Sequence, residues 1–171
     1  MKRVVNAIEN LSRISGKIAS YMIIPLTLVI LYTVIMRRFF GNSPDWGFEV
    51  TIFLFGIMIL LTGADTLRTK GHITVDILQS FIKGKSKLIL LTFIHILVII
   101  TSFLLLVKGV ELAIESTRIV EHSAHQTSFN PPIWWFKWFI PISAFILWLQ
   151  SLVELYKLWF EKGESDYGTN L

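Results

Sequence analysis

The sequence contains no cysteine, and only 16% of its 171 residues are charged. The absence of cysteine excludes disulfides, thiolate nucleophiles and cysteine-ligated metal sites. The charged fraction is well below the ~25% of a typical soluble domain, while 53% of the residues are hydrophobic. These values predict an all-α integral membrane protein that forms a single membrane domain over residues 1–171, without room for a separate soluble domain.

Motifs for catalysis are also missing. The chain has no glycine-rich phosphate loop and no nucleophile–base arrangement, and no acidic residue falls in the middle of an apolar run. We therefore expect no enzyme, no catalytic or substrate-binding residue, and no ion pathway within this chain alone. The net charge of +4 does not indicate nucleic acid, because the basic residues cluster beside the apolar runs.

Four apolar runs are long enough to cross a bilayer. They predict transmembrane helices at about 18–36, 46–64, 88–107 and 139–159. Helical spacing of apolar residues predicts two short amphipathic interfacial helices, at 1–17 and 73–82, and residues 160–171 form a polar tail. The third helix is expected to continue past the bilayer, since Lys108, Glu111, Glu115 and Arg118 recur at helical spacing.

Lysine and arginine counts give an orientation. With four spans, the two termini share one side of the membrane with segment 68–87, and eleven of the sixteen basic residues lie there. The positive-inside rule then places both termini in the cytoplasm.

Packing and anchoring residues follow from their positions. Gly56 and Gly63 lie two helical turns apart, so we expect them to share a face that packs closely on another helix. Interfacial anchors are expected at Trp46, Trp134, Trp135 and Trp138. Either Arg37 or Arg38 can pair with Glu49 at the same surface, although a solvated charge is the alternative.

The histidines do not favour a cofactor. His95 alone lies inside a span, where we expect it to bond to a neighbouring helix, while His72, His122 and His125 fall in connections. A bis-histidine haem is therefore disfavoured. His122, His125 and Glu121 could bind a metal, but a polar loop is the preferred interpretation because no third firm ligand is in view. No cofactor is expected.

One set of residues, taken in order, resembles a known family. The set is Arg37-Arg38-Phe39-Phe40-Gly41-Asn42-Ser43, Trp46 with Glu49, Gly63-Ala64, Arg68, Gly71-His72-Ile73-Thr74-Val75-Asp76, Pro132 with Trp134, and Pro141. It resembles the small membrane subunit of tripartite ATP-independent periplasmic (TRAP) transporters, the DctQ-like family, over nearly the whole chain. The segment Gly-His-x-x-x-Asp is the most specific part, whereas Gly47-Phe48 departs from the family, which often has a second acidic residue there.

The resemblance implies a subunit of the bacterial inner membrane, in a stable heterodimer with a large multi-span subunit that carries the sodium-coupled substrate site. A periplasmic binding protein would deliver an organic anion, such as a sialic acid or a dicarboxylate. The small subunit would act as a scaffold in contact with phospholipid. The alternative is a free-standing four-helix protein, either a small b-type cytochrome or a self-assembling channel.

Two residue sets are expected to serve this role. The first set contributes to periplasmic docking or internal pairing: Arg37, Arg38, Asp45, Glu49, Glu115, Arg118 and Glu121. The second set fixes the turn between the second span and the surface helix: Gly63, Arg68, Gly71, His72 and Asp76.

Overall fold

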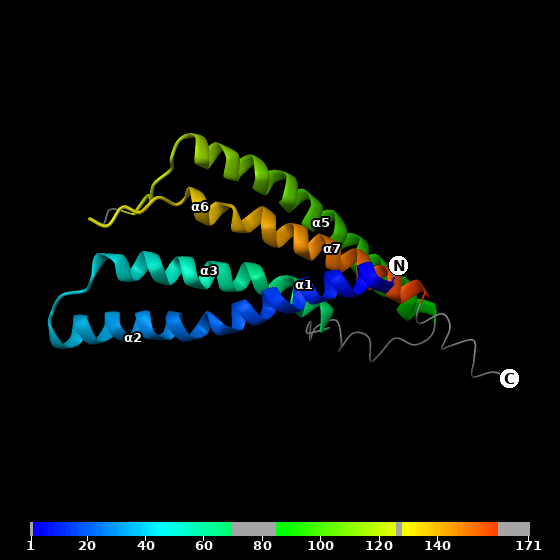
Figure 1. Ribbon diagram of the computed structural model, residues 1–171, viewed down its shortest axis with the longest axis horizontal. Helices are drawn as coiled ribbons and strands as arrows, with labels where there is room; N and C mark the ends of the chain where they lie inside the picture. The colour runs from blue at the N-terminus through cyan, green and yellow to red at the C-terminus, as the bar shows by residue number, and fades with distance from the viewer. Residues whose placement is uncertain (1, 70–84, 126–127, 161–171) are drawn as a thin grey trace.

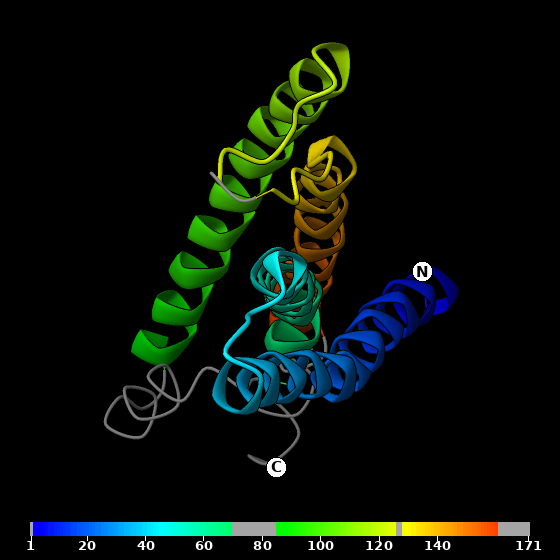
Figure 2. The same cartoon turned by 90° about the vertical axis from the view of Figure 1, so that its left-hand side faces the viewer.

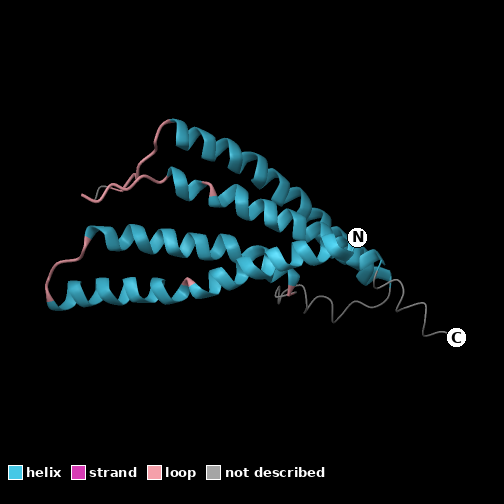
Figure 3. Ribbon diagram, viewed as in Figure 1, coloured by secondary structure: helices cyan, strands magenta, loops and turns pink. Residues whose placement is uncertain are grey.

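The described part of the chain is almost entirely helical. The computed structural model describes residues 2–69, 85–125 and 128–160 (Figure 3). For residues 85–87 it describes the backbone alone. The helices are α1 (Lys2–Tyr21), α2 (Ile23–Phe39), α3 (Asp45–Arg68), α5 (Lys85–Arg118), α6 (Trp134–Lys137) and α7 (Phe139–Phe160). Four stretches are long and apolar enough to cross a membrane: Lys2–Phe39, Asp45–Arg68, Leu88–Arg118 and Trp134–Phe160. The expected all-α membrane fold with four such helices is confirmed.

Helices α1 and α2 follow one another with a break at Met22. Pro25 explains the position of the break. Proline has no N–H to donate to the carbonyl of Tyr21, four residues earlier, and its ring crowds that carbonyl. The structure therefore places the end of the N-terminal helix at Tyr21, later than the boundary at residue 17 expected from the sequence.

Helix α1 packs through its small residues. Ser12, Ser15, Gly16 and Ala19 are buried, whereas the apolar residues Val4, Leu11 and Ile14 are exposed. Gly16 lets α1 approach α3 so closely that an added Cβ atom would overlap the Asp65 side chain. Further along α1, Ala19 packs on two α3 residues in the core cluster, Ile57 and Leu61. Burial of the small face leaves the apolar face of α1 free for lipid.

Helices α2, α3, α7 and α5 form an open array. Helix α2 packs on α3, α3 packs on α7, and α7 packs along α5, while α1 lies across α3 and α7. The end-on view shows α3 and α7 in the centre, with α2 and α5 on the outside (Figure 2). Helix α2 buries only Leu26, whereas α7 buries nine residues. The array exposes most of the apolar surface of its outer helices.

The α2–α3 pair is also displaced from the α5–α7 pair along the direction of the helix axes. Thr33 of α2 lies beside Gly47 near the start of α3, so this pair is nearly level. By contrast, Phe136 of α6 lies against Gly56, where an added Cβ would be 2.6 Å from its Cζ atom. Gly56 lies ten residues after Trp46, about 15 Å along the helix. Figure 1 shows the resulting stagger: the turn between α2 and α3 extends beyond the ends of α5 and α7.

Helix α5 continues to Arg118, as predicted, and its 34 residues correspond to about 51 Å. The segment between α5 and α6 then runs back beside the start of α3. It forms a short antiparallel bridge between His122 and Pro132. We call the end of the molecule that holds 40–44 and 119–133 the loop end, and the opposite end the N-terminal end.

Candidate functional site

The loop end is held together by carboxylates of α3. Glu49 is only 2% exposed, and its side chain accepts a hydrogen bond from the Ser123 hydroxyl. Asp45, one turn earlier, accepts a hydrogen bond from Ser128. The edge of the Phe48 ring meets the His125 ring, with centroids 4.8 Å apart. These contacts hold Ser123, His125 and Ser128 against the first turns of α3.

A second connection at the loop end joins that segment to α6. The Lys137 ammonium forms an ion pair with the Glu121 carboxylate, and the hydrogen bond between them lowers the pKa of Glu121 below its usual value. The amide of Ile133 donates to the Glu121 carbonyl at 2.8 Å. Glu121 is thus engaged through both its side chain and its backbone.

The other four residues expected to serve in docking or pairing have no partner among the described residues. Arg37, Arg38, Glu115 and Arg118 are exposed, and no ion pair or side-chain hydrogen bond engages them within the described residues. The expected pairing of Glu49 with Arg37 or Arg38 is wrong, because its carboxylate is turned inward toward Ser123. The seven expected docking or pairing residues therefore separate into three carboxylates that bond to other residues of the chain and four exposed charges without a partner among the described residues.

The expected aromatic anchors occupy different environments. Trp46 stacks on Tyr32 of α2, with ring centroids 5.7 Å apart, and Trp138 donates from its indole nitrogen to Thr117 Oγ1 at 3.0 Å. Trp135 instead packs edge-on against Phe53 of α3 at 5.2 Å. Trp134 is half-buried. Trp135 is therefore a packing residue between α6 and α3.

Of the residues expected to fix the turn after the second span, the structure describes two. Arg68 pairs with Asp65, with its Nη2 atom 2.8 Å from Oδ1. Apart from its chain neighbours and its own helix backbone, no described residue has a heavy atom within 4 Å of a Cβ placed at Gly63. The predicted close packing at Gly63 is therefore wrong for the described part of the chain, whereas Gly56 does pack closely on Phe136. Gly71, His72, Asp76 and the expected 73–82 helix lie outside the described residues.

The N-terminal end contains a polar cluster that the sequence analysis missed. Gln150 of α7 is fully buried; it accepts from Ser12 Oγ at 2.8 Å and donates to Glu154 Oε1 at 3.0 Å. The Lys157 ammonium pairs with Glu9 and lies 3.6 Å from Glu154. The available signal was the i, i+4 spacing of Gln150 and Glu154 on an otherwise apolar helix, opposite a small polar stripe in α1.

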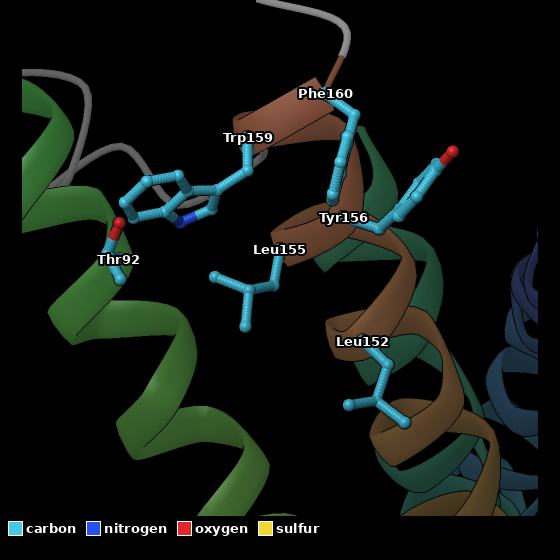
Figure 4. A pocket seen from close by; sticks show the side chains of 6 residues that line it. All are labelled: Thr92, Leu152, Leu155, Tyr156, Trp159 and Phe160. Carbon is cyan, nitrogen blue, oxygen red and sulfur yellow. The ribbon is translucent and has the colours of Figure 1, made fainter.

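An apolar groove lies between α5 and α7 at the N-terminal end (Figure 4). Its volume is about 420 Å³, and its lining comprises Thr92, Leu152, Leu155, Tyr156, Trp159 and Phe160. Thr92 donates its hydroxyl to the Leu88 carbonyl at 2.8 Å, and the rings of Tyr156 and Phe160 stack at 4.8 Å. The groove therefore presents mainly hydrocarbon and aromatic surface.

The histidines are engaged locally. His95 Nδ1 lies 2.8 Å from the Leu91 carbonyl of its own helix, which differs from the expected bond to a neighbouring helix. His122 Nδ1 lies 3.0 Å from the Asn130 carbonyl and helps to close the loop. Across the ranges that the structure describes, no three histidine or carboxylate side chains come together in a way that could hold a metal ion.

The comparison with family models decides the assignment. Residues 26–161 match the model described as tripartite ATP-independent periplasmic transporters, DctQ component. The chain belongs to this family. A search of curated proteins gave no match.

Family membership defines the setting of this DctQ component. The family works with a large membrane component, DctM, and a substrate-binding protein in TRAP transport systems. With four helices that can cross a bilayer, the chain is a multi-pass protein of the inner membrane. The resemblance inferred from the ordered sequence motifs is confirmed.

Proposed function

We propose that this DctQ component is a scaffold subunit that binds the large membrane component stably and helps to dock the periplasmic binding protein. The observation that carries the proposal is the open array. A free-standing four-helix bundle encloses a core between all its helices, whereas here α2 buries only Leu26. An array of this kind has broad apolar faces for a membrane partner and for phospholipid.

The described surface also suits a scaffold better than a conducting chain. The exposed hydroxyls of Thr27, Thr62 and Thr101 each donate to a carbonyl one turn earlier in the same helix. They therefore offer no ladder of free polar groups across the membrane. Sodium coupling and recognition of the organic anion, of the sialic acid or dicarboxylate class, would belong to the large component.

The scaffold role is tested by purifying the tagged chain in mild detergent from its native membrane. We expect a stoichiometric large membrane component by intact mass. Recovery of the chain alone, or only with copies of itself, would contradict the proposal and return attention to the channel and cytochrome alternatives. A conductance measurement and an absorption spectrum of the purified chain then separate those two.

For docking, the candidates are the four exposed charges of the loop end that have no partner among the described residues, and this end faces the periplasm if both termini are cytoplasmic. Arg37 and Arg38 end α2, and Glu115 and Arg118 lie in the last turns of α5. Because Asp45, Glu49 and Glu121 are engaged internally, we assign them to loop stability.

The double substitution of Arg37→Gln and Arg38→Gln tests the docking role. Loss of two exposed charges slows electrostatically guided association, so we expect weaker binding of the binding protein to the complex, with unchanged complex yield. The matched control is Arg13→Gln with Lys17→Gln, which removes two exposed charges of α1. Equal binding by both variants and the unmodified complex would remove the docking assignment while leaving the scaffold role intact.

A further inference from the structure

The apolar segments of the helices are stepped along the helix axes. Phe136 against Gly56 places the start of α7 beside the middle of α3, and Gly109 of α5 lies against Pro141 of α7. Counting 1.5 Å per residue from these contacts, the middle of the α5 apolar run at Leu97 lies about 25 Å from the middle of the α3 run at Phe55. The displacement is directed toward the N-terminal end.

An upright array does not fit one bilayer. The hydrocarbon core is about 30 Å thick, so its surfaces lie about 15 Å from its centre. With α3 upright and Phe55 at the centre, Leu97 falls outside the core and Lys108 falls inside it. The Lys108 and Glu111 side chains are 76% and 68% exposed, and exposed charges are strongly disfavoured in hydrocarbon.

We propose that the bilayer crosses the array obliquely, so that Leu28, Phe55 and Leu97 lie at the same depth. All three side chains are exposed, and each lies near the middle of its apolar run. The interaction surface is thus a belt of aliphatic and aromatic side chains that runs diagonally over α2, α3 and α5. Its partner is the acyl-chain region of the membrane.

The size of the step sets the inclination. Two helix spacings of about 9 Å separate α3 from α5, so a step of this size inclines α3 to the bilayer normal by an angle on the order of 50°. This tilt is at or beyond the steep limit of membrane helices in general.

The positions of charged residues at both ends support the oblique arrangement. In this arrangement Lys108 and Glu111 of α5 lie at the same membrane surface as Arg37 and Arg38, which end α2. The ion pair between Lys157 of α7 and Glu9 of α1 lies at the other surface. The proposal uses only the packing of this chain and does not depend on the transporter assignment.

The absence of cysteine makes the depth directly measurable. The full chain carrying Leu28→Cys, Phe55→Cys or Leu97→Cys is spin-labelled in phospholipid vesicles, and depth is derived from collision rates with oxygen and a water-soluble nickel chelate. We expect the three labels to lie within about one helical turn, ~5 Å, of the same depth. A deep label at Phe55→Cys with a water-accessible label at Leu97→Cys would overturn the proposal.

A second measurement uses a position outside the belt. In the oblique arrangement, Lys108→Cys reacts with a membrane-impermeant maleimide from the same side as Arg38→Cys, since both residues are exposed at one membrane surface. In an upright array Lys108→Cys is inside the hydrocarbon core and is protected. Protection of Lys108→Cys while Arg38→Cys reacts would therefore refute the oblique arrangement independently of the spin labels.

Discussion

The contact between α1 and α3 gives the sharpest stability prediction. At Gly16 an added Cβ atom would overlap the Cβ and carboxylate of Asp65, and the carboxylate cannot swing away freely because Arg68 holds it at 2.8–2.9 Å. Overpacking costs about 1–3 kcal/mol, and here we expect the upper part of that range. Replacing a helical glycine with alanine regains up to about 1 kcal/mol. Gly16→Ala should therefore destabilise the chain by about 1–2 kcal/mol.

Gly63→Ala is the matched control. It is the same substitution in a helix, but beyond the local helix backbone no described residue comes within 4 Å of the new Cβ, so only the helix-propensity gain of about 0.5–1 kcal/mol remains. The two variants should shift unfolding in opposite directions, as measured by circular dichroism of the purified chain during titration from mild detergent into dodecyl sulfate. If Gly16→Ala proved as stable as Gly63→Ala, the close approach of α1 to α3 would be refuted.

Three further predictions concern the polar contacts at the two ends. Lys157→Glu should lower stability by placing a third carboxylate beside Glu9 and Glu154, and combining it with Glu9→Lys should recover part of the loss in the same titration. Gln150→Leu should cost about 1–2 kcal/mol, because Glu154 loses its buried donor; a neutral result would argue against the cluster. Because its partner lowers the pKa of Glu121, the Glu121–Lys137 bond stabilises the loop above the usual carboxyl pKa of about 4.3 and loses that contribution as pH falls through the lowered value. The protection factor of the Ile133 amide, which is its exchange rate relative to the intrinsic rate at the same pH, should therefore fall as pH drops through the lowered pKa of Glu121, and Glu121→Gln should abolish that fall.

The long helices could be predicted from the sequence because the bilayer constrains them strongly. Apolar runs of about twenty residues with few charges have few alternatives to a transmembrane helix. The continuation of α5 to Arg118 was also predictable, since its charges keep helical spacing. Gly56 was recognised as a packing residue, but its partner Phe136 is eighty residues away, and nothing local to either segment specifies that contact.

The faces of the helices were harder to predict, because in a membrane the apolar face is not necessarily the packed face. The stripe of Val4, Leu11 and Ile14 indicated an interfacial helix, yet the packed face of α1 is the row of small residues that includes Ser12 and Gly16. Lipid solvates leucine as well as another helix does, so close backbone approach and hydrogen bonds decide helix packing there. A search for small residues at helical spacing would have found this face.

The stagger of the helices explains why the Glu49 carboxylate bonds within the chain and is not free for an arginine. Glu49 looked available to an arginine because both lie near one membrane surface, but Ser123 reaches it from a loop that the helix stagger brings alongside α3. The stagger leaves the first turns of α3 without α7 as a neighbour, and Ser123, His125 and Ser128 contact them instead. Burial of Glu49 and the oblique crossing of the bilayer are thus two consequences of one displacement, and a change that restores level packing of α3 and α7 would disturb both.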